Sequence, residues 1–204
     1  MLKEAIDQIK TALLMLLVFT LITGLFYPLM VTAVAQLIFP KQANGSLIRK
    51  SNIVIGSQFI GQSFSSPAYF WSRPSSTLPF PYNGEASSGS NFGPDNRLFL
   101  AKVKERIAKL RESNPENNEL IPIDLITASG SGLDPEISPR AAFYQVARVA
   151  KARKMSVLDL KKIIREQIKN RTFGFLGEPR VNVLELNLKL DTLGTSNEQN
   201  APKS

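Results

Sequence analysis

The side chains that could carry chemistry in this chain are few, because its 204 residues include no His and no Cys. Ser-His-Asp and Cys-His catalysis are therefore excluded, and a zinc site would need carboxylates alone, which is unusual. A serine hydrolase of the Ser–Lys type, using Ser129 or Ser131, is the enzyme alternative. It needs a desolvated lysine, and none lies near these serines in the sequence. We therefore predict no catalytic residue and no metal site.

Two loops of small residues, 87–94 and 127–132, could bring backbone N–H groups close to a phosphate or carbonyl oxygen. Neither carries the Gly-Lys-Ser/Thr of a P-loop, and neither is a G-x-S-x-G elbow. Ordinary turns are the alternative interpretation for both. A third segment, 173–180, mixes bulky apolar residues with glycines, and core packing under a turn is its alternative.

Basic residues concentrate between Arg140 and Arg180, where eleven Lys and Arg oppose three acids. This excess equals the +8 net charge of the whole chain. It could face anionic lipid, an acidic partner or nucleic acid, or form a solvated helix face. Residues 139–169 also have a helix-turn-helix outline, with a turn at Met155-Ser156. A nucleic-acid binder is thus a second alternative, although the basic residues are scattered.

The element that must position all of these is the stretch 11–39, which holds 29 residues without a charge. As a helix it extends roughly 43 Å at about 1.5 Å per residue, and about 20 apolar residues cross a bilayer. We predict a transmembrane helix, with residues 1–10 continuing it outside the membrane. Pro28 is tolerated there and is expected to give a kink.

This stretch has two alternatives to a permanent anchor. Ala33-Val34-Ala35 resembles a signal-peptide cleavage site, but the preceding apolar run is longer than the usual h-region. A core helix of a soluble protein is disfavoured by the length and uniform hydropathy of the run. The flanking charges leave the orientation of the helix open.

The remaining chain is predicted to form one domain, 40–193, followed by a disordered tail, 194–204. One or two strands are expected within 52–64, and an ordered, aromatic loop within 65–97. Strands are also expected at 120–128 and, from strict alternation, at 184–191. The predicted helices run from 97 to 112 after an Asn96 cap, from 139 to 154, and from a Ser156 cap to 169.

Several motifs, taken in order, resemble one family: the C subunit of the bacterial Kdp complex, a high-affinity potassium-transporting P-type ATPase. The resemblance extends from the apolar stretch to about Asp191. The motifs are Tyr69–Pro74, Tyr82-Asn83, Ser88–Pro94, Asp124–Pro135, Ile137–Pro139, Tyr144–Val146 and Gly174–Asn187.

The resemblance implies a single-pass inner-membrane protein with a cytoplasmic N-terminus (1–10) and a periplasmic domain. The implied fold class is α+β, with one N-terminal transmembrane helix and a single mixed α/β extracytoplasmic domain. The implied partners are a potassium-translocating subunit, an ATP-hydrolysing subunit, a small hydrophobic subunit and the lipid bilayer. The implied role is that of a catalytic chaperone that raises the ATP affinity of the hydrolysing subunit, with no tightly bound cofactor of its own.

The family is also likened to ABC transporters through a Ser-Gly-Gly-Ser loop and a later Gln, which implies joint ATP contact. The matching positions are Ser88, Gly89, Ser90 and Gln145. Here the paired glycines are replaced by Ser88-Gly89, and Ala147 replaces a family proline, which should straighten the helix. Because a periplasmic domain does not meet cytoplasmic ATP, we favour an assembly role over direct nucleotide contact.

The aromatic loop 69–82 and the loop 127–135 are predicted to cover the outer face of a partner, since ordered aromatic residues in an irregular loop suit an interface. The residues predicted to lie at this interface are Tyr69, Phe70, Trp71, Arg73, Tyr82, Asn83, Asn91, Ser129 and Asp134.

Overall fold

The computed structural model describes the backbone of residues 2–199 and the side chains of residues 2–193. The described chain divides into two compact units, with the boundary between Leu47 and Ile48. The first unit is helical. The second combines helices with short strands, so the predicted mixture of helix and sheet is confirmed.

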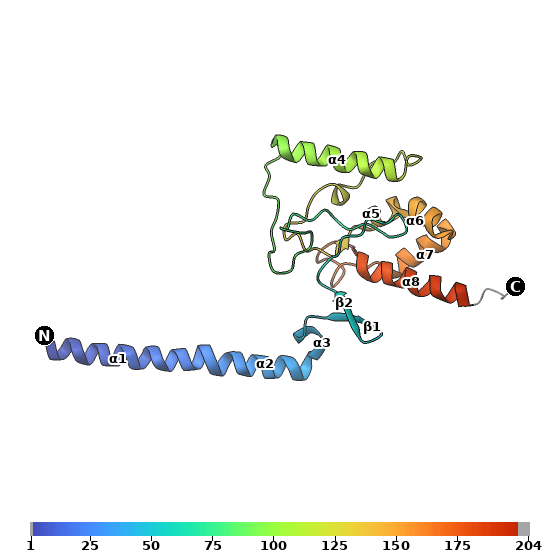
Figure 1. The fold of residues 1–204 in the computed structure, drawn as a ribbon. Helices are drawn as coiled ribbons and strands as arrows, with labels where there is room; N and C mark the ends of the chain where they lie inside the picture. Colours follow the sequence, from blue (N-terminus) through green and yellow to red (C-terminus); the bar gives the residue numbers. More distant parts are fainter. Residues whose placement is uncertain (1, 200–204) are drawn as a thin grey trace. The chain divides into compact units, whose positions relative to one another are not determined.

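The first unit is one long apolar helix followed by a short one. Helix α1 (Leu2–Leu21) passes through a π-helical turn (Ile22–Phe26) into α2 (Tyr27–Ile38), and α3 (Pro40–Ala43) follows. In the turn, the Tyr27 N–H donates to the Ile22 carbonyl, five residues back. The wider turn accommodates Pro28, which lacks an N–H and crowds the preceding turn. Helices α1 and α2 run on in one direction (Figure 1), so the expected kink is replaced by a π-turn.

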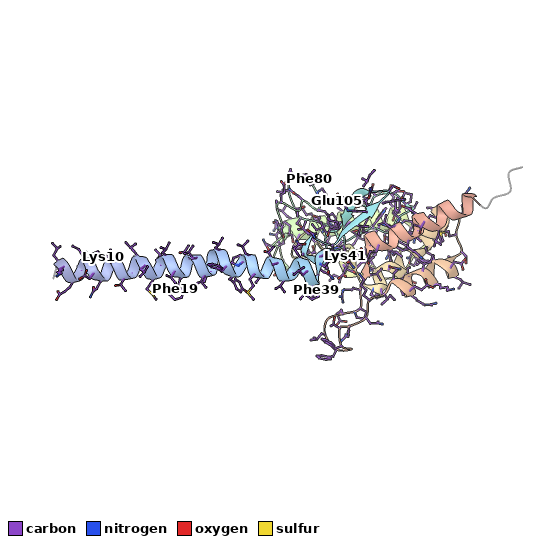
Figure 2. The ribbon with its side chains drawn as sticks, turned by 90° about the horizontal axis from the view of Figure 1, so that it is seen from below. Lys10, Phe19, Phe39, Lys41, Phe80 and Glu105 are labelled. Carbon is purple, nitrogen blue, oxygen red and sulfur yellow. The ribbon has the colours of Figure 1, made fainter. Side chains whose placement is uncertain are left out.

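This helix is long and apolar enough to cross a membrane over Leu2–Ile38, with a mean hydropathy of 2.2. No residue in its most apolar stretch of 18 residues is buried. The side chains of the helix, including Phe19 and Phe39, project outward on all sides (Figure 2). A buried core helix of a soluble protein does not fit this exposure. The described part of the chain therefore contains one candidate span, at the position where the sequence predicts a transmembrane helix.

The second unit opens with a hairpin of β1 (Leu47–Lys50) and β2 (Ile53–Ser57). Its two turn residues, Ser51 and Asn52, have φ of 49° and 66°, the left-handed pair that matches strand twist in a two-residue hairpin. Strand β2 was predicted. Strand β1 was not, because its segment lies in a largely polar stretch and precedes the Asn52–Phe64 run that carries the strand pattern.

Four helices form most of the core: α5 (Pro139–Tyr144), α6 (Val146–Arg153), α7 (Val157–Gln167) and α8 (Val183–Gln199). They lie together in Figure 1. The predicted Ser156 cap is confirmed, since its hydroxyl accepts the Leu158 amide. At the helix start predicted at residue 139, the Ser138 hydroxyl accepts the Ala141 amide. A two-stranded antiparallel sheet, β3 (Glu136–Ile137) with β4 (Val181–Asn182), joins the ends of these helices.

Helix α4 (Arg97–Ser113) stands apart from this group (Figure 1). The predicted Asn96 cap is confirmed, because its side chain accepts the amides of Leu98 and Phe99. Only Leu110 of the helix is buried, whereas Leu98 and Leu100 are exposed. The helix therefore joins the core only through its C-terminal end.

Two strand predictions are wrong. The segment 120–128 contains a 3₁₀ turn (Ile123–Leu125), because Pro122 has no N–H to give a ladder and its φ of −60° suits a turn. Residues 184–191 belong to α8. The Asn182 side chain accepts the Glu185 amide and caps this helix, which outweighs the alternating pattern.

Burial along α8 follows a helical period, with its buried residues at Val183, Leu184, Leu186, Asn187 and Leu190. The helix continues to Gln199, where a disordered tail was expected from residue 194. Residues 200–204 of that expectation lie outside the described residues.

Candidate functional site

The aromatic loop is held by two buried side-chain amides that bind the backbone of adjacent residues. Asn187 accepts the Phe70 N–H at 2.9 Å and donates to the Phe70 carbonyl at 3.0 Å. Gln145 does the same for Trp71, at 2.7 and 3.1 Å. Each amide thus replaces a neighbouring strand, satisfying both backbone groups of a segment that has no sheet.

Gln145 also explains why α5 and α6 are separate helices. Its backbone N–H donates to Ala142, three residues back, while its side-chain Nε2 donates to Ala141, four residues back. The side chain therefore takes the carbonyl that the backbone normally uses. The helix predicted over 139–154 is interrupted here, although Ala147 stands in place of a proline.

Two arginines of the basic segment point into the protein rather than into solvent. Arg148 is 6% exposed and donates to the carbonyls of Pro67 and Tyr69 and to the Gln145 side chain. Its guanidinium carbon lies 4.1 Å from the Trp71 ring centroid, a cation–π contact. Burial lowers the pKa of Arg148 to about 10, so it remains charged at neutral pH.

The second arginine, Arg153, fixes the start of the aromatic loop. It donates to the Ala68 carbonyl and pairs with Asp191 at 2.8 Å. Asp191 also accepts the Tyr69 hydroxyl at 3.2 Å. A solvated helix face, one of the interpretations of residues 140–180, therefore does not apply to Arg148 and Arg153, because their charges bind loop carbonyls and an acid.

A third cluster joins the aromatic loop to the loop 127–135. Arg73 pairs with Asp134 at 3.1 Å, and the Tyr82 hydroxyl donates to the Arg73 carbonyl. Ser75 donates to the Gly132 carbonyl at 2.7 Å. Burial is the main cause that raises the pKa of Tyr82 to about 12. The two loops predicted to act together are thus linked by direct contacts.

The residues predicted for ATP contact lie in two different places. The Ser88 backbone N–H donates to the Ser131 carbonyl at 2.9 Å, and this bond holds residues 87–91 against 129–132. A side chain at Gly89 would meet the Gly130 carbonyl at 2.7 Å, so the loops approach closely. Ser88 is exposed and Ser90 half-buried. Gln145 is 2% exposed, and its amide is occupied by the protein itself.

The residues predicted for the partner interface differ widely in exposure. Phe70 and Asn83 are buried, as is Ser129, whose hydroxyl accepts the Gly132 amide. Asn91 is exposed, with φ of 51°. The others are half-buried and bonded within the domain: Tyr69, Trp71, Arg73, Tyr82 and Asp134. Most of these side chains therefore shape the two loops from within.

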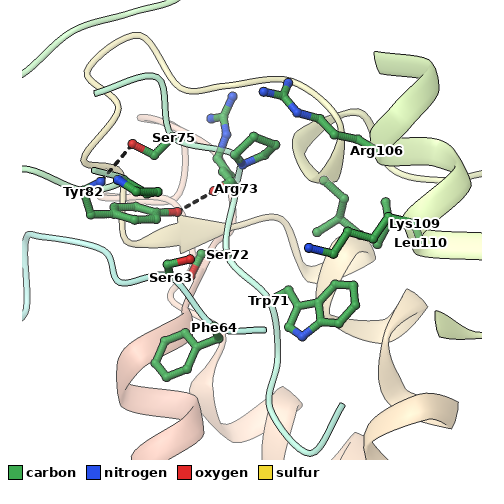
Figure 3. A pocket seen from close by; sticks show the side chains of 13 residues that line it. Ser63, Phe64, Trp71, Ser72, Arg73, Ser75, Tyr82, Arg106, Lys109 and Leu110 are labelled. Carbon is green, nitrogen blue, oxygen red and sulfur yellow. Dashed lines mark hydrogen bonds between the residues drawn. The ribbon is translucent and has the colours of Figure 1, made fainter. Parts of the chain in front are cut away.

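A pocket of about 250 Å³ opens between the aromatic loop and α4. Figure 3 shows Trp71, Arg73 and Tyr82 on one side and Arg106 and Lys109 on the other. Sequence reasoning missed Arg106, Lys109 and Asn187, which with Gln145 clamps the backbone of the aromatic loop. The helical pattern over 97–112 placed the two cations off its apolar face, and no sequence signal connected that helix to the loop.

The alternative functions find no support in these contacts. Among the described residues, no lysine is hydrogen-bonded to Ser129 or Ser131. In the helix-turn-helix outline, Arg148 is buried rather than presented for recognition. Among the side chains of residues 2–193, no three acidic groups gather where they could hold a metal ion.

The fold and its contacts define a protein with a membrane-type helix and a mixed domain built around a clamped aromatic loop. The chain belongs to the KdpC family, described as "K+-transporting ATPase, c chain", which matches residues 9–192. A Potassium-transporting ATPase KdpC subunit from Methylococcus capsulatus is 58% identical over 188 residues, covering 92% of this chain and 99% of that protein. One from Sorangium cellulosum is 52% identical, covering 90% and 97%.

Proposed function

We propose that this chain is a non-catalytic subunit of an ATP-driven potassium uptake pump. The observation that carries the proposal is the family match over 9–192, which includes both the membrane-type helix and the clamped domain. The partners would be the potassium-translocating, ATP-hydrolysing and small hydrophobic subunits of the same pump. The helix would anchor the chain in the inner membrane, with the N-terminus cytoplasmic and the domain periplasmic.

The second part of the proposal is that the chain supports assembly and raises the ATP affinity of the hydrolysing subunit. The burial of Gln145 argues for an effect transmitted through assembly, since its amide is already bonded to Trp71 and Arg148. If ATP is contacted jointly with the hydrolysing subunit, Ser88 is the accessible member of the predicted set.

The test is to co-express the pump with the full chain, without it, and with its span replaced by a polyleucine helix. Potassium-stimulated ATPase activity and the ATP dependence of that activity are measured on purified membranes. With the full chain, the pump subunits should co-purify. Without it they should not, and the KM for ATP of any remaining activity should be higher. Normal assembly and turnover without the chain would refute the proposal. The polyleucine variant separates anchoring from specific packing of the helix.

The interface part of the proposal rests on the exposed tip of the aromatic loop, where Leu78 is 75% and Phe80 56% exposed. Phe80→Ser should leave the domain folded and reduce co-purification with the pump. Leu158→Ser, at a 76% exposed position on α7, is the matched control and should not. Equal recovery of the complex with both variants would exclude the tip as a contact.

A further inference from the structure

The pocket beside α4 has an excess of positive charge. Arg106 and Lys109 lie one turn apart on α4 and both face the pocket (Figure 3). The third cation, Arg73, already pairs with Asp134. None of the described residues that line the pocket is acidic. Two of the three positive charges thus have no counter-ion in this space.

Arg106 is partly withdrawn from water, and the charge of its neighbour Glu105 offsets only part of the effect of burial. One of its terminal nitrogens donates to the Ile126 carbonyl at 2.8 Å, and burial lowers the pKa of its guanidinium. Desolvating a charge is unfavourable unless it is paired. Lys109 has no ion pair with the described residues, and its amine lies 5.7 Å from the Trp71 ring centroid. An anion bound here would offset the cost at Arg106 and give Lys109 a partner.

Part of the remaining wall is apolar and aromatic, formed by Phe64, Trp71, Leu110 and Leu125. Other uncharged residues complete it, among them Ser63, Ser72, Ser75 and Tyr82. The volume of about 250 Å³ lies below the roughly 300–1,000 Å³ of sites for drug-sized ligands. We propose that this pocket binds a small amphipathic anion, consisting of one carboxylate on an aromatic or apolar body. The carboxylate would pair with Arg106 and Lys109, and the body would lie against Trp71 and Leu110.

The chain carries its own reporter for this proposal, because Trp71 is its single tryptophan. We would titrate the purified full chain in detergent with benzoate and follow Trp71 fluorescence at constant ionic strength. Benzoate should change the fluorescence saturably. Benzyl alcohol, which has the ring without the charge, and acetate, which has the charge without the ring, should each bind at least about tenfold more weakly.

Lys109→Met and Arg106→Met should each weaken benzoate binding at least about tenfold. Lys104→Met removes an exposed cation from the same helix outside the pocket and is the matched control. Lys109→Met removes no hydrogen bond within the described domain, so it keeps the test valid if Arg106→Met does not fold. Equal binding of benzyl alcohol or acetate, or unchanged benzoate affinity in Lys109→Met, would overturn the proposal. No pump subunit is needed, so this result is independent of the proposed function.

Discussion

At the scale of single residues, the aromatic loop depends on side chains that act as backbone partners. Gln145 and Asn187 each satisfy one N–H and one carbonyl of the loop. Because Phe70 is buried and Trp71 half-buried, removing either amide leaves several polar groups with little or no access to water unsatisfied at once. The polar residues of this domain therefore determine its shape as much as its apolar core does.

Gln145→Ala should destabilise the domain by about 3 kcal/mol. The backbone N–H and carbonyl of Trp71 each lose a hydrogen-bond partner, and Arg148 loses an acceptor. Urea unfolding of the full chain in detergent, followed by Trp71 fluorescence, measures the change. Lys151→Ala on α6 is the control, since its side chain is 83% exposed, and it should change stability by less than about 0.5 kcal/mol. A Gln145→Ala variant as stable as this control would contradict the clamp.

Tyr82 predicts how stability depends on pH. Its pKa is raised from 10.0 to about 12 in the folded domain, mainly by burial, so the folded state holds the phenolic proton more tightly. The stabilisation is fully present below pH 10 and is lost as pH rises through about 12. Between pH 9 and 12 the wild type should lose about 2 kcal/mol more unfolding free energy than Tyr82→Phe. Parallel pH profiles of the two proteins would refute this.

At the scale of elements, helix α7 connects a local cap to the core. Ser156 accepts the Leu158 amide, and the helix then buries Leu160, Ile163 and Ile164. Helix α4 has a similar cap at Asn96 but buries only Leu110. The same capping interaction therefore affects global stability at α7 and mainly local helix order at α4.

Ser156→Ala should lower the unfolding free energy by about 1 kcal/mol, since one amide at the start of α7 loses its acceptor. Ser156→Asp is the matched control, because a carboxylate can accept the same hydrogen bond and favours a helix N-terminus. Thermal unfolding monitored by circular dichroism distinguishes the two. Equal losses in both variants would show that the hydroxyl is not acting as a cap.

The sequence predicted those elements whose signals are local. The long apolar run, the caps at Asn96 and Ser156, and the helices that follow these two caps were confirmed. The helix predicted from 139 begins there but is interrupted at Gln145. The strand predicted at 184–191 was wrong because alternation in a short segment competes with a cap, here Asn182, whose effect depends on the following burial.

The contacts of the site could not be predicted in the same way. The amides of Gln145 and Asn187 reach partners 74 and 117 residues away, and no local pattern encodes such pairs. The motifs indicated that residues 69–74 are important, but not that Phe70 is buried. The pocket is likewise formed by α4 and a loop whose proximity follows only from the tertiary fold.

At the scale of the whole molecule, the lack of cysteine in the sequence makes the proposed orientation directly testable. Single cysteines at Gln8 and at Glu112, both exposed, report on the N-terminus and the domain. In intact cells, a membrane-impermeant maleimide should label Glu112→Cys but label Gln8→Cys only after lysis. Labelling of Gln8→Cys in intact cells would reverse the orientation, and loss of this position from the mature protein would favour a cleaved signal sequence.

The bond between Phe70 and Asn187 also sets an order of events during synthesis. The two residues are separated by 117 positions, so Phe70 lacks this partner until the start of α8 has left the ribosome. The apolar N-terminal helix emerges long before that. The contact between Phe70 and Asn187 therefore forms late, and contacts between residues so far apart in the chain slow the step in which they form.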